Sequence, residues 1–202
     1  MLSVKVDNQE FSADFSKMRS MNDLIELIKA TIDPDKIIVG IELNNEPLSE
    51  ADWNTPLNTM LNAVQNAELS VMSGNVQDYM KDRFTVAEPY LQHIMAKFSD
   101  ASQQYRGGQF ENANKQLSTA VQDLLAFLNW YMAVMQMKPE SYRTEIGEFN
   151  NYVKNLQGVC EGMVQQQMFQ AWWALGDTLQ SKLTPSLDSL KTFCGRNANA
   201  SM

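Results

Sequence analysis

A strand and a turn follow one another in residues 37–48, which read IIVGIELNNEPL. β-Branched residues dominate residues 37–43 and favour a central strand. Residues 44–47, Asn-Asn-Glu-Pro, carry the side chains that form tight turns. Further on, residues 67–72 alternate between apolar and polar side chains, which is the period of another strand. These segments predict a β-sheet in the N-terminal third of the chain.

The residues before this strand predict a hairpin and one helix. Residues 2–6 alternate apolar and polar, residues 7–9 read as a turn, and the alternation resumes at Phe11, Ala13 and Phe15. Ser20 and Asp23 have the spacing of a capping box that opens a helix. Its apolar positions recur at helical spacing up to Asp33-Pro34, which ends it: Leu24, Leu27, Ile28 and Ile32.

The order of these elements is hairpin, helix, strand, short irregular stretch and strand. In the irregular stretch, Ser49 and Asp52 can cap one helical turn that holds Trp53. With residues 41–48 and the late strand Leu69-Ser70-Val71, this order resembles the β-grasp, or ubiquitin-like, family. The resemblance implies a mixed sheet of four or five strands around one helix. It also implies a domain that offers a sheet face or edge to a partner.

Beyond Ser73-Gly74-Asn75 the apolar period changes from 2 to about 3.6, which marks a domain boundary. We therefore predict an α+β protein with a β-grasp-like domain over residues 1–73. An antiparallel four-helix bundle is predicted over residues 76–195, followed by a frayed tail over residues 196–202.

Several residues set the expected helix ends in the C-terminal part. The first helix begins either at a Thr85–Glu88 capping box just before Pro89, or near Val76 with a kink at Pro89. Gly107-Gly108 separates it from a second helix over residues 109–137, and Lys138-Pro139 ends that one. A further break is expected near residues 164–167, and Thr184-Pro185 should kink or restart the last helix.

Residues 105–117, YRGGQFENANKQL, followed by Ala120 and Leu124, resemble the helical hairpin of flagellin-type export chaperones. They are also similar to generic helical-repeat hairpins. The first resemblance implies a bundle that grips an amphipathic segment of a client protein.

The formal net charge of −8 is unevenly placed. Residues 1–73 carry 5 Lys and Arg against 12 Asp and Glu, a net charge of −7. Such a surface disfavours nucleic acid and anionic membranes and fits a basic protein partner, or it only supplies solubility. With no visible signal peptide, no apolar run long enough to span a bilayer and two cysteines, the expected location is cytoplasmic.

The residues that most often carry chemistry show no catalytic pattern. His93, Cys160 and Cys194 lack metal-ligand spacing, and both thiols fall on apolar helix faces, which predicts structural cysteines. A di-iron site needs a His three residues after a Glu, and the chain has one His without that spacing. We therefore predict no catalytic, cofactor-binding or metal-binding residues, including among Glu145, Glu148 and Glu161.

The dipeptide Trp172-Trp173 is the most distinctive candidate. Adjacent helical positions lie about 100° apart, so one ring can enter the core while the other remains at its border. With Phe169, Met163 and Met168 these rings form either packed core or a docking patch. Asp177 lies one turn further on and either faces solvent or pairs with a basic side chain.

The favoured function is a non-enzymatic, intracellular protein-interaction module: an adaptor, chaperone or assembly factor. It would bind a partner through the sheet edge or the aromatic patch of Trp172, Trp173, Phe169, Met168 and Asp177. The alternative is an enzyme or small-ligand-binding protein with a pocket between the domains or inside the bundle. A homo-oligomeric component is a third hypothesis that the sequence does not separate from the first.

Overall fold

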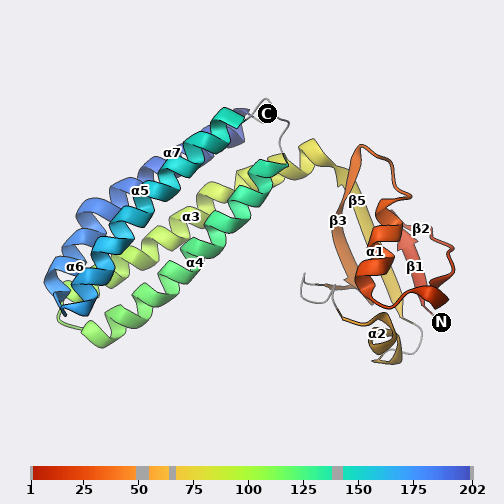
Figure 1. The fold of residues 1–202 in the computed structure, drawn as a ribbon, viewed down its shortest axis with the longest axis horizontal. Helices are drawn as coiled ribbons and strands as arrows, with labels where there is room; N and C mark the ends of the chain where they lie inside the picture. Colours follow the sequence, from red (N-terminus) through yellow and green to blue (C-terminus); the bar gives the residue numbers. More distant parts are fainter. Residues whose placement is uncertain (1, 49–54, 64–66, 138–142, 201–202) are drawn as a thin grey trace. The chain divides into compact units, whose positions relative to one another are not determined.

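The computed structural model describes residues 2–48, 55–63, 67–137 and 143–200. It divides into two compact units, Met1–Tyr79 and Met80–Met202, which we call the sheet unit and the helical unit. The boundary between them lies in the first turns of helix α3, which begins at Val76 directly after strand β5 ends at Asn75. The chain is therefore an α+β protein, with a small mixed sheet followed by a helical region (Figure 1).

The sheet unit contains short strands and helices. The strands are β1 (Ser3–Val6), β2 (Gln9–Glu10), β3 (Lys36–Leu43), β4 (Glu46–Pro47) and β5 (Glu68–Asn75). The helices are the 3-10 turn η1 (Phe15–Lys17), α1 (Met21–Lys29) and α2 (Leu57–Ala63). The strands form one sheet in the order β2-β1-β5-β3-β4, in which β1 and β5 are parallel and all other neighbours are antiparallel.

Two tight turns join the antiparallel pairs at the sheet edges. Asp7 and Asn8 between β1 and β2 have φ angles of 50° and 65°, and Asn44 and Asn45 between β3 and β4 have 53° and 66°. Two successive positive φ angles give a hairpin turn whose twist matches that of the strands. Asn and Asp tolerate this conformation better than other non-glycine residues, and both turns lie where these residues predicted them.

Helix α1 covers one face of the sheet. The predicted capping box is confirmed, because the Ser20 hydroxyl accepts a hydrogen bond from the Asp23 N–H and the Asp23 carboxylate accepts one from the Ser20 N–H. The core that lies between helix and sheet consists of nine buried apolar side chains: Val4, Met21, Leu24, Ile25, Ile28, Ile41, Leu57, Leu69 and Val71.

The second strand of the predicted hairpin is shorter than the alternation of Phe11, Ala13 and Phe15 indicates. Strand β2 ends at Glu10, and Phe15 begins a 3-10 turn. Both phenylalanines still pack against the core, so burial of their rings, rather than strand pairing, produces the alternation. The predicted helical turn around Trp53 lies outside the described residues.

The Asp7 carboxylate ties the first turn to β5. The Ser73 hydroxyl and N–H donate to it at 2.6 and 2.7 Å, and the Lys36 ammonium lies 3.8 Å away. These hydrogen bonds, with the smaller effect of Lys36, hold the pKa of Asp7 below its ordinary value.

Folding lowers the pKa of Asp7. The stability that this carboxylate contributes is therefore fully present at pH values above its ordinary pKa, and it is lost as the pH falls through the pKa of the folded state. We expect Asp7→Asn to keep the turn, since Asn tolerates positive φ, but to weaken the acid dependence below about pH 4. Urea unfolding of both proteins at neutral and acid pH measures this. If the parent chain and Asp7→Asn lose the same free energy of unfolding between neutral and acid pH, the Asp7 carboxylate does not contribute to acid unfolding.

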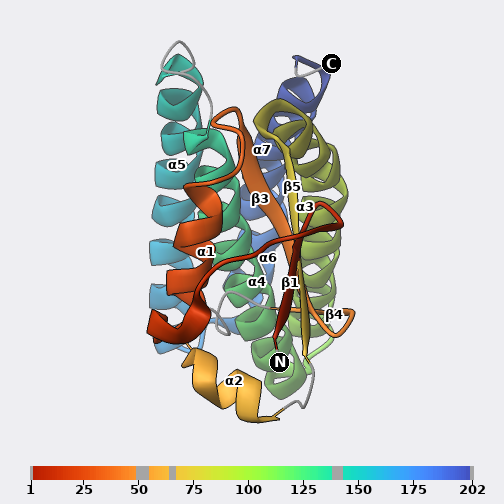
Figure 2. The same ribbon diagram turned by 90° about the vertical axis from the view of Figure 1, so that its right-hand side faces the viewer.

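The helical unit contains α3 (Val76–Arg106), α4 (Phe110–Gln136), α5 (Arg143–Met168), α6 (Trp172–Thr178), the π-helical turn η4 (Leu179–Leu183) and α7 (Thr184–Ala200). Helices α3, α4, α5 and α7 run alongside one another in two perpendicular views (Figures 1 and 2). Side-chain pairs link them: Lys97 with Asp123, Lys191 with Gln92, and Arg196 with Glu148. A cluster of aromatic rings lies in the interior, where Phe84, Phe127, Tyr131, Phe149 and Phe193 pack on one another.

Three helix ends differ from the simplest prediction. Helix α3 passes through Pro89, so the single long helix is correct and the Thr85–Glu88 capping box is not; the Thr85 hydroxyl instead donates to the Lys81 carbonyl. Helix α5 continues to Met168, past the break expected at residues 164–167. Helix α7 continues to Ala200, where a frayed tail was expected, because Asn197 is buried and Arg196 pairs with Glu148.

At Thr184-Pro185, where a kink or a restart is predicted, the helix widens into the π-helical turn η4 and continues as α7. Pro185 has no N–H, and its ring would clash with the carbonyl of Ser181 four residues earlier in a regular α-helix. The preceding turn widens, and both the N–H and the hydroxyl of Thr184 donate to the Leu179 carbonyl five residues back. Helices α6 and α7 therefore form one continuous rod with a widened turn between them.

Candidate functional site

The turn between α5 and α6 has a defined backbone. The Ala171 N–H donates to the Gln166 carbonyl at 2.8 Å and the Gln170 N–H to that of Gln167 at 3.0 Å. This pair of bonds is a Schellman motif, and Gln170 occupies its left-handed position with a φ of 54°. The α3–α4 turn has the same motif with Gly108 at φ 74°, the residue type that fits this conformation without strain.

Side chains from both flanking helices hold the α5–α6 turn against the α3–α4 hairpin. The Gln167 amide donates to Asn114 Oδ1 at 3.0 Å, and the Tyr105 hydroxyl donates to the same oxygen at 2.6 Å. The Arg106 guanidinium pairs with Asp177 at 2.7 Å. The Gln167 and Asp177 contacts tie the turn and the start of α6 to the α3–α4 hairpin.

Four large apolar side chains on and beside this turn face solvent; we call them the turn patch. Their exposed fractions are 55% for Val164, 76% for Met168, 83% for Phe169 and 60% for Trp173. Side chains of this size are seldom left exposed together on an isolated chain unless they bind something. Two of the four are aromatic and one is Met, the residue types enriched at protein interfaces.

The two adjacent tryptophans have different environments. Trp172 is half-buried and stacks on Tyr105 at 6.0 Å and on Phe110 at 5.8 Å between ring centroids. Trp173 projects into solvent as part of the turn patch. As the helical geometry predicts, one ring of the pair packs against the helices, that of Trp172, and the other is exposed, that of Trp173. Met163 is buried, and Asp177 is exposed and paired with Arg106 at the edge of the patch.

A second apolar surface, which we call the aromatic groove, lies between α3 and α4. It has a volume of about 430 Å³ and is lined by Arg83, Val86, Tyr90, Ala126 and Trp130. A buried ring supports its aromatic walls, because Tyr90 and Trp130 both pack on Phe127, at 5.7 and 5.8 Å between centroids. The groove is therefore preformed.

A third surface is a hollow of about 630 Å³ between α3 and the rod formed by α6 and α7. Amides and hydroxyls dominate its lining, including Gln92, Ser99, Gln103, Gln180 and Thr184. Its charged groups are internally paired, since Arg106 bonds Asp177 and Asp188 lies 3.5 Å from Lys191. This hollow is the most polar of the three surfaces.

The segment that carries all three surfaces has a family assignment. Residues 82–193 match a domain of unknown function, DUF8042. The chain belongs to this family. Searches of the curated proteins and of the solved structures found no match.

The remaining candidates of the helical unit are dispersed. His93 is exposed on α3, Cys160 is half-buried on α5 and Cys194 is buried on α7. Burial raises the pKa of Cys160, and it raises that of Cys194 to about 12, so neither thiol is activated. Among the described residues, no three His, Cys, Asp or Glu side chains are grouped to hold a metal ion, and no helix is long and apolar enough to cross a membrane.

The sequence predicts Met168, Phe169 and Trp173 of the turn patch as candidates, but it indicates neither Val164 nor the aromatic groove. The signal for these three residues is local, because Met168 and Phe169 lie within a few residues of the Trp172-Trp173 dipeptide. Tyr90 and Trp130 are 40 positions apart, and only the α3–α4 hairpin brings them together. The available signal was that both are large aromatic residues outside the apolar stripes of their helices.

Proposed function

We propose that this DUF8042 protein is a non-enzymatic, intracellular protein-interaction module that binds a protein partner through the turn patch. The observation that carries the proposal is the exposure of Val164, Met168, Phe169 and Trp173 on and beside the α5–α6 turn. Aromatic anchors on a rigid support lose little conformational entropy on binding, so they supply affinity efficiently.

We further propose that the sheet unit is a β-grasp domain and the helical unit an antiparallel four-helix bundle. The mixed strand order with one helix on one face supports the first assignment. The side-by-side helices and the pairs between them support the second. The resemblance of residues 105–117 to export chaperones stays a prediction.

The sheet edges are less suited to the proposed binding than the turn patch. Both edge strands, β2 and β4, are two residues long, and β4 includes Pro47. Short strands and proline reduce the number of backbone groups that can pair with an added strand. We therefore place the partner site on the helical unit.

The test is capture of partners from lysate of the source cells on immobilised full-length chain. We expect Trp173→Ala to reduce capture of a stoichiometric partner at least about tenfold, the effect of losing one interface anchor, without lowering the melting temperature. Leu125→Ala, which also truncates an exposed apolar side chain, is the matched control and should retain capture. Equal capture by all three proteins would contradict the turn patch as the binding site.

A further inference from the structure

The segment that carries the turn patch is uncharged. Residues 162–176, which run from the last turns of α5 into α6, contain no Asp, Glu, Lys, Arg or His, although 20% of the chain is Asp, Glu, Lys or Arg. Residues 107–110 of the α3–α4 turn, whose Phe110 stacks on Trp172, are uncharged as well. Depletion of charge together with aromatic residues and Met is the composition found at the centre of protein interfaces.

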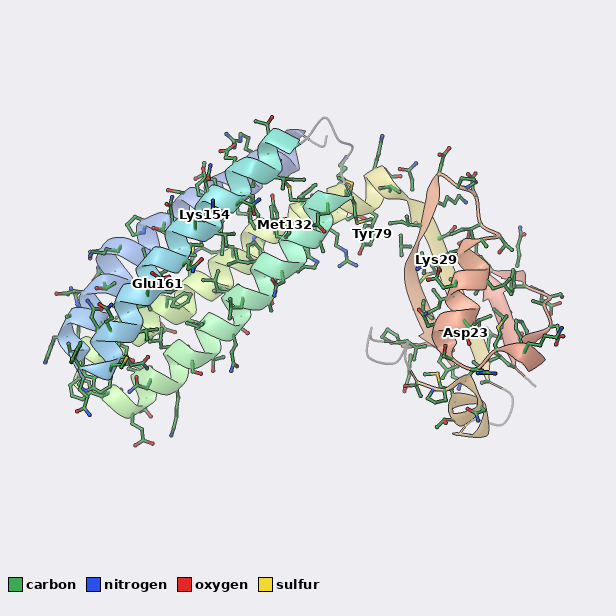
Figure 3. The ribbon with its side chains drawn as sticks, viewed as in Figure 1. Asp23, Lys29, Tyr79, Met132, Lys154 and Glu161 are labelled. Carbon is green, nitrogen blue, oxygen red and sulfur yellow. The ribbon has the colours of Figure 1, made fainter. Side chains whose placement is uncertain are left out.

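Charged side chains begin only at the border of this segment. The first on either side of residues 162–176 are Glu161 and Asp177. Asp177 pairs with Arg106 at 2.7 Å. Glu161 lies on α5 (Figure 3), where its carboxylate accepts a hydrogen bond from the Gln157 amide at 3.2 Å. Both carboxylates have partners within the chain, and no charge lies among the four side chains that compose the patch.

The acidic charge of the chain is concentrated outside the helical unit. Residues 1–79 carry 5 Lys and Arg and 13 Asp and Glu, a net charge of −8. Residues 80–202 carry 11 and 11, a net charge of zero. The basic partner that the acidic N-terminal third predicts is therefore not a partner that the turn patch selects by charge.

The turn patch is also convex. Met168 and Phe169 are exposed by 76% and 83%, and Trp173 by 60%, so most of each side chain contacts solvent rather than a neighbour. A flat surface covers a projecting side chain from one side, whereas a hollow covers it from several sides and removes more apolar area from water. The patch therefore fits a concave partner.

The side chains around the patch supply the polar part of an interface. The four side chains of the patch expose on the order of 500 Å², below the roughly 800 Å² that each side of a stable interface covers. A partner of the usual size therefore also contacts the exposed rim of the patch, which includes the amides of Gln165, Gln167 and Gln170. An amide donates and accepts hydrogen bonds without carrying charge, so it matches hydroxyls, other amides and backbone groups.

We infer that the partner of the turn patch is a protein with an uncharged apolar hollow and an uncharged hydrogen-bonding rim, and that charge takes no part in the recognition. The hollow takes the rings of Phe169 and Trp173, and the rim bonds the glutamine amides. A zwitterionic lipid surface also lacks net charge, but its hydrocarbon offers the amides no hydrogen bond. This inference rests on the proposed function, since it names the class of partner for the same site.

The first test uses a probe with the inferred chemistry. β-Cyclodextrin is an uncharged ring of sugars with an apolar cavity and a hydroxyl rim, and its sulfated and amino-substituted forms add negative or positive charge to the same cavity. Isothermal titration of the full chain at physiological salt should show binding of the uncharged form, and neither charged form should bind more tightly.

Variants assign this binding to the patch. The double variant Phe169→Ala/Trp173→Ala should reduce the association constant at least about tenfold. Leu125→Ala, which truncates an exposed apolar side chain elsewhere, is the matched control and should leave it unchanged. No binding of the uncharged form, tighter binding of either charged form, or equal binding by the double variant would each overturn the inference.

The second test places charge at the rim. Gln165→Glu and Gln165→Lys introduce opposite charges one turn before Phe169, and the uncharged Gln165→Ser is the matched control. Both charged variants should capture at least about threefold less of the stoichiometric partner than Gln165→Ser, because each sets a charge against an uncharged surface. Capture by the parent chain should change by less than about twofold between about 50 and about 500 mM sodium chloride.

The opposite outcomes identify other partners. Stronger capture by Gln165→Glu would show a basic partner, and stronger capture by Gln165→Lys an acidic one; either overturns the inference. Binding to phosphatidylcholine vesicles that Trp173→Ala abolishes would assign the patch to a lipid surface and would overturn it too. If capture falls with salt while Trp173→Ala still abolishes it, the inference fails and the proposed function stands. If Trp173→Ala leaves capture unchanged, the proposed function itself fails.

Discussion

Replacing Trp172 with alanine is expected to lower the free energy of unfolding of the helical unit by about 3 kcal/mol. The indole is stacked nearly parallel to Tyr105, with an interplanar angle of 8°, and also stacks on Phe110. Its removal leaves a void at the junction of α3, α4 and α6 and takes contacts from both rings. The value is at the lower end for tryptophan because the ring is only half-buried.

The measurement is urea unfolding followed by far-ultraviolet circular dichroism, which the helical unit dominates. A loss of about 3 kcal/mol corresponds to a fall of roughly 10 °C in melting temperature for a unit of this size. Trp173→Ala is the matched control, and its exposed ring should cost less than about 0.5 kcal/mol. Equal losses for the two variants would show that Trp172 does not hold the turn against the α3–α4 hairpin.

Replacing Gly176 with valine is expected to lower the free energy of unfolding by a similar amount, because it adds atoms at a close contact instead of leaving a void. A Cβ at Gly176 would lie 3.1 Å from Tyr105 Cβ and 3.4 Å from the Ser102 carbonyl oxygen, so α6 approaches α3 more closely than most side chains would allow. The Ser102 hydroxyl also donates to the Gly176 carbonyl at 2.8 Å across this contact. Valine would force the helices apart at a cost of about 3 kcal/mol.

The controls for this substitution come from α5. A Cβ at Gly158 or Gly162 would meet no atom within 4 Å, so alanine there removes chain entropy from the unfolded state without a clash. We expect Gly158→Ala and Gly162→Ala each to stabilise the protein by about 0.5–1 kcal/mol. If close packing of α6 on α3 is the cause, urea unfolding should show a lower free energy of unfolding for Gly176→Val and a higher one for Gly158→Ala and Gly162→Ala. A neutral Gly176→Val would refute that close contact.

The predicted elements match the structure best where the signal is local. The Ser20–Asp23 capping box, the Asn44-Asn45 turn and the Gly107-Gly108 turn each depend on a few adjacent residues. The end of α5 was predicted less accurately. Its turn uses Gln170 in a left-handed conformation, and glutamine carries no sequence signal for that conformation.

Only the local part of the candidate site could be predicted from the sequence, because contacts between distant residues leave no local signal. The position of the turn patch follows from the adjacent residues Met168 and Phe169 and from helical geometry at Trp172-Trp173. Which tryptophan is exposed depends on Tyr105 and Phe110, which lie more than 60 residues earlier in the chain. The aromatic groove depends entirely on such distant pairs.

By itself the sequence determined the α+β class, the change from strand to helix near residue 75 and most of the apolar helix faces, because periodicity and turn chemistry act over a few residues. Tertiary structure alone decided the strand order, the close approach of α6 to α3 and the faces left uncovered by other helices. Those features arise when segments distant in the chain compete to bury the same surface, and packing, rather than local preference, selects the outcome.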